Sequence, residues 1–183
     1  MMVRTTYFEI RDPAAIRPAR RVPADVAMVR ALEPSPELNR YFYTAVGGDW
    51  HWRERLGWTW KEWLASISRP GHETWYLTWR GTPAGYFELD STAPPDAEVA
   101  FFGLLPAFAG RGLGGWWLEQ ALRRGFELGT RVWLHTCSLD SPAAIPNYLA
   151  RGMVTFRTEE RDRPVGPPVG PWPGAERPKW SEP

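Results

Sequence analysis

A glycine-rich loop between a short apolar run and a long amphipathic helix constrains the fold of this chain more than any other stretch. Residues 99–105 have the length and composition of a buried strand, and Pro106 ends the run. Four glycines follow, at Gly110, Gly112, Gly114 and Gly115. The sequence therefore predicts a strand, a tight loop and a helix in immediate succession.

The helix after the loop is predicted by apolar side chains that return every three or four residues. One face is apolar and contains Leu113, Trp117, Leu118, Ala121, Leu122 and Phe126. The other face carries Glu119, Gln120, Arg123, Arg124 and Glu127. Gly129 is suited to end the helix. We expect the apolar face to pack against a sheet and the charged face to meet solvent.

A glycine loop that opens a helix can bind a phosphate group. Glycine has no Cβ, so a ligand can approach the backbone closely. The first amides of a helix have no partner within it and lie at the positive end of the helix dipole. These properties favour a pyrophosphate site. The alternative is a tight turn that only joins the strand to the helix.

Two common nucleotide-binding patterns do not fit this loop. Gly110, Gly112 and Gly115 match the dinucleotide fingerprint, but no acidic residue ends the next predicted strand, residues 131–136. The loop also comes too late in the chain to begin a doubly wound sheet. The Walker pattern fails because no Gly-Lys-Ser/Thr follows.

The loop does resemble a known acyl-CoA site. Residues 104–114 are similar to the pyrophosphate loop of the GNAT N-acetyltransferase superfamily, which runs Arg/Gln-x-x-Gly-x-Gly/Ala after a strand. Gly112 and Gly114 take its last two positions. Ala109 stands where the family usually has Arg or Gln, so that side chain is missing.

A second block supports the resemblance. Residues 141–153 look like the family's Asn-x-x-Ala-x-x-x-Tyr-x-x-x-Gly-Phe segment. Ala144, Tyr148 and Gly152 keep the spacing, while serine and methionine replace the first and last residues. The resemblance implies an α+β, GNAT-like acyl-CoA N-acyltransferase fold. This fold has a mixed central sheet, with an antiparallel meander and two splayed parallel strands, flanked by helices.

Local patterns predict the other elements. Strands are expected at residues 5–10, 73–80, 84–90, 131–136 and 154–162. Helices are expected at residues 25–32, 36–46 and 59–67, and from Pro142 after an N-cap at Ser141. We expect residues 1–162 to form the GNAT-like domain. Residues 163–183 are rich in Pro and Gly and predict a tail that contacts the domain through Trp172 and Trp180 or stays mobile; a PxxP-type partner motif is the alternative.

Composition narrows the function classes. The 183 residues carry a formal net charge of +1 with both signs interspersed, which gives no footprint for nucleic acid. Cys137 is the only cysteine, so an internal disulfide is excluded and a cytoplasmic location is favoured. No stretch approaches the length of a membrane span, and the N-terminus lacks a signal-peptide core. The three histidines are scattered, so no metal site is expected.

An aromatic segment between the first two strands is a candidate acceptor wall. Residues 41–63 hold eight aromatic side chains, five of them tryptophans. Such walls suit a ring-bearing or cationic acceptor. The alternative is that these rings are core and surface cover. No single residue can be chosen from the sequence.

The resemblance also implies how acetyl-CoA is held. The backbone of Leu104 and Leu105 would pair with the pantetheine arm as a strand does. The main-chain amides of residues 110–115 would hold the pyrophosphate. That stretch includes Gly110, Arg111, Gly112, Leu113, Gly114 and Gly115. Asn147 is expected to contact the pantetheine arm.

Acetyl transfer to an amine needs a base and an acid. Glu98 has the register of a catalytic glutamate found in some family members, and a solvated edge carboxylate is the alternative. Tyr148 is the candidate acid that protonates the leaving thiolate, and a structural tyrosine is the alternative. The leading interpretation is an N-acetyltransferase that moves the acetyl group of acetyl-CoA to a primary amine of a small molecule, without a metal.

Two other functions stay open at this point. One is a peptide or protein N-acetyltransferase. The other is a non-catalytic acyl-CoA-binding module, which the departures at Ala109 and Ser141 leave open. Family members are often dimers, so a homodimer is one expected assembly. No membrane or nucleic-acid partner is expected.

Overall fold

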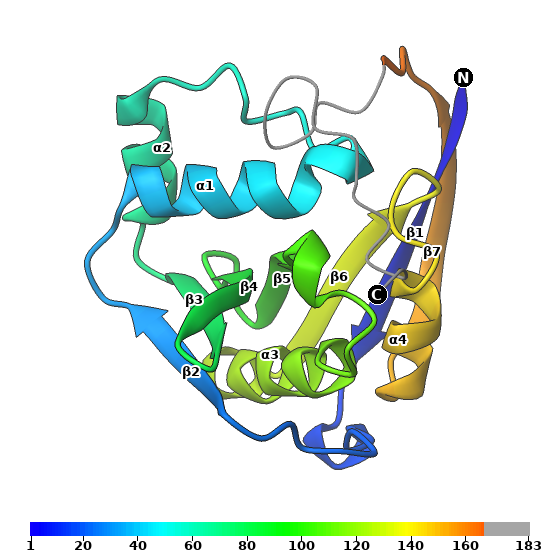
Figure 1. The fold of residues 1–183 in the computed structure, drawn as a ribbon. Coiled ribbons are helices and arrows are strands. Elements are labelled where there is room, and N and C mark those ends of the chain that lie inside the picture. Colours follow the sequence, from blue (N-terminus) through cyan, green and yellow to red (C-terminus); the bar gives the residue numbers. More distant parts are fainter. Residues whose placement is uncertain (167–183) are drawn as a thin grey trace, which may run out of the picture.

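A computed structural model describes residues 1–166 of the chain; Trp172 and Trp180 lie outside this part. The strands form one sheet in the order β2-β3-β4-β5-β6-β1-β7 (Figure 1). They are β1 (Met2–Ile10), β2 (Val26–Ala31), β3 (His72–Trp79), β4 (Thr82–Asp90), β5 (Asp96–Leu104), β6 (Arg131–Cys137) and β7 (Val154–Asp162). The helices are α1 (Pro36–Gly47), α2 (Trp60–Ile67), α3 (Gly114–Leu128) and α4 (Ala144–Ala150). Short 3-10 helices are η1 (Pro13–Ala15), η2 (Gly48–Trp50) and η3 (Pro106–Phe108).

The sheet is mixed, as predicted. Strands β2 to β5 form an antiparallel meander, and β6 runs parallel to β5. The parallel pairing covers only three residue pairs, of which the last joins Glu98 and Trp133. Beyond this pair the two strands separate. The splayed strands expected from the sequence are therefore present.

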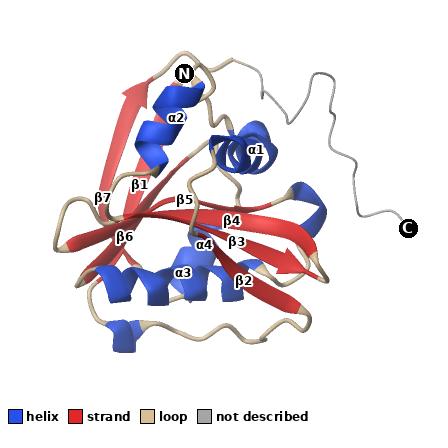
Figure 2. Cartoon of the chain, turned by 90° about the vertical axis from the view of Figure 1, so that its left-hand side faces the viewer, coloured by secondary structure: helices blue, strands red, loops and turns tan. Residues whose placement is uncertain are grey.

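Helices cover both faces of the sheet (Figure 2). Helix α3 lies on one face and buries Trp117, Leu118 and Leu122 completely in the main core. Helix α1 lies on the other face, where Phe42 stacks on Tyr86 of β4 with ring centroids 5.1 Å apart. The apolar stripe predicted for α3 is thus the stripe that packs on the sheet.

The N-terminal strand lies far from the strands that follow it in sequence. β1 is inserted between β6 and β7 and runs antiparallel to both. Its Phe8 is fully buried and contacts the Tyr148 ring edge-on at 5.4 Å. β1 therefore lies directly beside β6, one of the two strands that separate, and no local pattern could predict this position. β7 ends at Asp162, and the separation of residues 163–183 as a tail stays a prediction.

One predicted helix is wrong. Within residues 25–32, Val26–Ala31 form the edge strand β2, which pairs with β3 along its whole length. Val26 and Met28 pack against the core and Ala27 and Arg30 are exposed. Six residues are too few to separate a strand period from a helical one, so pairing with β3 decided the outcome.

Two smaller expectations also fail. Helix α4 begins at Ala144 rather than at Pro142, and the Ser141 hydroxyl accepts a hydrogen bond from the Ala143 amide at 3.3 Å in the preceding turn. Glu119, expected on the solvent face of α3, is only 8% exposed. Its carboxylate accepts hydrogen bonds from the Ala19 amide at 2.7 Å and from Arg123. The loop after β1 therefore covers this part of α3.

Candidate active site

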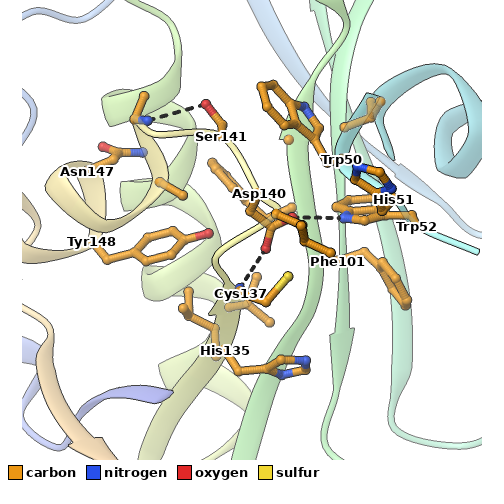
Figure 3. A pocket seen from close by; sticks show the side chains of 18 of the residues that line it. Trp50, His51, Trp52, Phe101, His135, Cys137, Asp140, Ser141, Asn147 and Tyr148 are labelled. Carbon is orange, nitrogen blue, oxygen red and sulfur yellow. Dashed lines mark hydrogen bonds between the residues drawn. The ribbon is translucent and has the colours of Figure 1, made fainter. Parts of the chain in front are cut away.

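A cavity of about 830 Å³ lies where β5 and β6 separate. Its lining comes from the glycine loop, the first turn of α3, helix α4, the β6–α4 loop, and the segment after α1. Asn147 and Tyr148 lie on one side, Trp50, His51 and Trp52 lie on the other, and Asp140 lies between them (Figure 3). The cavity therefore connects the predicted cofactor loop with the predicted acceptor wall.

The backbone of Leu104 faces the open side of β5. The Leu105 amide donates to the Ala84 carbonyl of β4 at 2.8 Å, and the Leu105 carbonyl accepts from the Phe108 amide at 2.9 Å. Successive residues of a strand direct their backbone groups to opposite neighbours, so the N–H and C=O of Leu104 point toward the gap. Leu104 can pair with an extended ligand there. Leu105 cannot, because its backbone groups are already bonded, and it does not line the cavity.

The glycine loop has the geometry of an anion site. Gly110 and Gly112 have φ values of +77° and +81°, which side chains rarely adopt. At the helix start, the Trp117 amide donates to the Leu113 carbonyl at 2.9 Å. The amides of Gly114, Gly115 and Trp116 precede it and have no acceptor within the helix. These amides lie at the positive end of the α3 dipole.

Two predicted loop residues do not line the cavity. Arg111 is exposed, and its guanidinium lies over the rings of Trp79 and Phe108, 5.5 and 5.7 Å from their centroids. Leu113 is 1% exposed and packs in the main core. Of the predicted loop and strand residues, the five that line the cavity are Leu104, Gly110, Gly112, Gly114 and Gly115.

Asn147 ties α4 to the start of α3. Its Nδ2 donates to the Gly114 carbonyl at 3.2 Å. Asn147 also lines the cavity, so its remaining amide oxygen is near any ligand on the helix start. The contact fixes the distance between the two helices at the loop.

Tyr148 is a buried residue of the cavity wall. It is 7% exposed and lines the cavity from α4. Burial, together with the negative charge of Asp140, raises the pKa of its phenol well above the usual value, and this outweighs a hydrogen bond with Thr136 that lowers it. The hydroxyl therefore keeps its proton throughout the neutral range.

Asp140 was not predicted, because no motif marks it. Its Oδ2 accepts from the Thr136 hydroxyl at 2.6 Å and from the Cys137 amide at 3.0 Å. Its Oδ1 accepts from the Trp52 indole at 3.3 Å. This carboxylate thus bridges the β6–α4 loop and the aromatic segment across the cavity (Figure 3). Burial of the Cys137 thiol, together with the negative charge of Asp140, raises the pKa of that thiol. Cys137 is therefore not an activated nucleophile.

Glu98 lies at the closed end of the gap and does not line the main cavity. It lines a second cavity of about 340 Å³, together with Tyr7 and Trp133. Its Oε1 is 3.5 Å from Nδ1 of His135, and His135 does line the main cavity. The sequence did not predict the contact between Glu98 and His135.

The aromatic segment divides between core and cavity. Trp63 and Phe42 are buried in the core. Trp50, Trp52 and Trp58 line the cavity, so only part of the segment is core.

A buried ion pair holds this wall in place. The Arg55 guanidinium donates to Oε2 of Glu88 at 2.7 Å and lies over the rings of Trp58 and Phe101. Glu88 is fully buried and also accepts from Nδ2 of Asn39 at 3.0 Å. A buried charge needs such partners, so these contacts fix the segment to β4. Burial lowers the pKa of His72, which lies 3.6 Å from the same carboxylate.

No group of three or more histidine, cysteine or acidic side chains arranged for a metal ion occurs within residues 1–166. Over the same residues, no helix has the length and apolar character needed to cross a membrane.

Comparisons with known proteins agree with this geometry. The model of the acetyltransferase (GNAT) family matches residues 32–153. No curated protein matches the chain. A GCN5-related N-acetyltransferase from Kribbella flavida superimposes with a TM-score of 0.63 at 21% identity, over 86% of this chain and 57% of that one. The chain thus spans between half and two thirds of the length of this structure.

Two other solved structures share the fold. The ribosomal-protein-S18-alanine N-acetyltransferase from Escherichia coli has a TM-score of 0.53 at 18% identity, covering 69% of this chain and 76% of that one. An aminoglycoside acetyltransferase from an uncultured soil metagenomic sample, in complex with sisomicin, has a TM-score of 0.56 at 9% identity, covering 69% and 88%. At these identities the likeness concerns the fold. Because the family model covers most of the sequence, this chain belongs to the GNAT acetyltransferase family.

Proposed function

We propose that the protein is an acetyl-CoA-dependent N-acetyltransferase that acts on a primary amine of a small molecule. The observation that carries the proposal is a single cavity that joins free helix amides, an unpaired strand edge and a protonated tyrosine. Members of the GNAT family generally use acetyl-CoA. The glycine loop fits that group, because the backbone at Gly110 and Gly112 leaves open space around it.

Each part of the cavity has a defined role toward the thioester. The amides at the start of α3 hold the diphosphate, and the backbone of Leu104 pairs with the pantetheine amides. Bound acetyl-CoA supplies the activated acetyl group. The protein orients this group in the gap between β5 and β6, where Tyr148 borders the cavity.

The chemical step exchanges a C–S bond for a C–N bond. The substrate ammonium loses a proton to a base, and the free amine attacks the thioester carbonyl carbon. The C–S bond then breaks, the thiolate leaves, and the amide nitrogen releases its extra proton to solvent. Tyr148 donates its proton to the leaving sulfur and is reprotonated from solvent. The raised pKa keeps the phenol protonated before the step, which is the state that a proton donor needs.

His135 is the proposed base, and Glu98 is proposed as the residue that positions it. The Glu98 carboxylate lies next to Nδ1, which leaves Nε2 as the basic nitrogen. His135 is exposed and lines the cavity, so a substrate ammonium can reach it directly or through a water molecule. This assignment gives Glu98 a role in base catalysis without contact with the substrate.

The shape of the acceptor side favours a small molecule. Trp50, Trp52 and Trp58 form one wall, and the hydrogen bond between Trp52 and Asp140 narrows the space between the two sides. A volume of about 830 Å³ is within the range of small-ligand pockets. The aminoglycoside acetyltransferase among the structural neighbours agrees with this class of acceptor.

A peptide acceptor is the second candidate. Tyr7 lines both cavities, so a longer acceptor could continue along the sheet past His135. The S18-alanine N-acetyltransferase agrees with this class. The test is release of free thiol from acetyl-CoA across a panel of small amines and short peptides. Thiol release with small amines supports the proposal, release with peptides alone supports the second candidate, and binding of acetyl-CoA without release for any amine indicates a non-catalytic binding module.

A further inference from the structure

Arg151 is a buried cation whose side chain has no partner in the described part of the chain. It follows α4 and is 8% exposed. Its Nε has no hydrogen-bond partner, and no carboxylate within residues 1–166 lies within ion-pair distance of its guanidinium. The contacts that Arg151 does make come from its backbone, for example the Arg17 amide that donates to its carbonyl at 3.0 Å.

The guanidinium lies beside the first turn of α3. A Cβ built on Gly115 would be 3.3 Å from Nη1 of Arg151 and 3.7 Å from Oδ1 of Asn147. Gly115 and Gly114 line the main cavity. The cation therefore sits at the helix start whose free amides are already positive.

Two like charges placed together in a buried position are unfavourable without an anion. The next acidic side chain along α3 is Glu119, one turn further, and its carboxylate already accepts from Arg123 and the Ala19 amide. An unpaired buried charge destabilises a fold, and arginine pairs with phosphate in a favourable fork geometry. Within residues 1–166 no such anion is present, and a phosphate-type anion would supply the missing partner.

We propose that Arg151 binds a phosphate group of acyl-CoA at the start of α3 and replaces the side chain that the loop lacks at Ala109. This inference rests on the proposed function. The cation comes from the end of α4 rather than from the loop, but it reaches the same helix terminus. The phosphate belongs to the diphosphate or to the 3′-phosphate, and the experiment distinguishes the two.

The test measures binding by calorimetry for wild-type protein and for Arg151→Gln and Arg151→Lys. The ligands are coenzyme A, dephospho-coenzyme A and inorganic pyrophosphate. Arg123→Gln is the matched control, because it removes one positive charge from a half-exposed side chain of α3, two turns beyond Gly115. Loss of one charge-assisted contact predicts that Arg151→Gln binds coenzyme A about 10- to 100-fold more weakly, while Arg151→Lys recovers part of the affinity.

Dephospho-coenzyme A identifies the phosphate. If wild type and Arg151→Gln still differ with this ligand, Arg151 binds the diphosphate, and pyrophosphate alone should then stabilise only the wild type. If the difference disappears, Arg151 binds the 3′-phosphate. Either result supports the inference.

The melting temperature of the free protein separates a binding role from a packing role. Removal of an uncompensated charge should leave the melting temperature of Arg151→Gln unchanged or higher. A lower melting temperature with unchanged coenzyme A affinity would show that Arg151 only packs, and would overturn the inference. If wild type binds coenzyme A and Arg151→Gln binds it equally well, this inference alone fails. If wild type binds no coenzyme A, the proposed function fails with it.

Discussion

Gly114→Ala should preserve both cofactor binding and stability. Gly114 is the first residue of α3 and has no left-handed backbone that would require glycine. A Cβ at this position would lie 3.7 Å from Cδ1 of Leu104 and 3.9 Å from Nδ2 of Asn147, which are ordinary contact distances. The protein itself therefore has room for the methyl group.

The free energy of unfolding should not fall in this variant. Alanine is favoured over glycine in a helix by up to about 1 kcal/mol, and less at the first position. For a chain of this size, that corresponds to a rise in the melting temperature of at most about 4 °C. We expect a change between zero and this limit.

Cofactor affinity should stay close to the wild-type value in the same variant. The methyl group would lie between Leu104 and Asn147, which both line the cavity, at ordinary contact distances. Alanine keeps the backbone amide, and the GNAT pyrophosphate loop takes glycine or alanine at this position. We therefore expect a Kd for acetyl-CoA within about threefold of the wild-type value, or about 0.7 kcal/mol.

Calorimetric titration and thermal melting measure the two effects on the same sample. Gly57→Ala is the control, because its Cβ would meet nothing within 4 Å and Gly57 does not line the cavity. A folded Gly114→Ala protein that binds acetyl-CoA more than about 10-fold more weakly than wild type would contradict the match of Gly114 with the last position of that loop.

Three further predictions concern the loop, the acid and the base. Gly112→Val forces a β-branched residue into a φ of +81°, and this strain should lower the free energy of unfolding by about 1–2 kcal/mol and with it the melting temperature. The variant should also bind acetyl-CoA more weakly. Unchanged affinity in a folded variant would contradict the assignment of the glycine loop as the diphosphate site. Tyr148→Phe should lower kcat by 10-fold or more with little change in Kd for acetyl-CoA. Because the pKa of the Tyr148 phenol is raised above its usual value, ionisation of this group should cause no loss of wild-type rate at any pH up to 10. Equal kcat in the two proteins would remove Tyr148 from the acid role. His135→Gln should lower kcat by 10-fold or more, and Glu98→Gln should lower it less, with no change in Kd for acetyl-CoA in either variant; wild-type kcat in both variants would exclude this pair.

The parts of the site that depend on local sequence could be predicted. The loop glycines and the first turn of α3 are set by backbone requirements that the sequence shows directly, and they line the cavity together with Asn147 and Tyr148. The capping box that begins α2 at Thr59 and the proline that begins α1 are equally local, and both are observed. Short-range geometry was sufficient in these cases.

The parts that depend on distant contacts could not be predicted. Asp140 acquires its place through a hydrogen bond to Trp52, 88 residues away in the chain. Insertion of β1 between β6 and β7 brings Tyr7 to the cavity, and no pattern in the N-terminal segment indicates this neighbour. Arg151 occurs in a segment that the sequence identifies, but only the structure shows that its side chain is buried beside Gly115, which is the observation that suggests a phosphate-binding role.

The central claim is that the backbone amides at the start of α3 hold the diphosphate of coenzyme A. The most direct measurement is a ¹⁵N–¹H correlation spectrum of the protein titrated with coenzyme A, with the amide signals of Gly112, Gly114 and Gly115 assigned. We predict large shifts for these three signals, and only small shifts for Gly57 and Gly81, which do not line the cavity. Saturable binding that leaves the three loop signals in place would contradict the account, as would a spectrum that coenzyme A does not change.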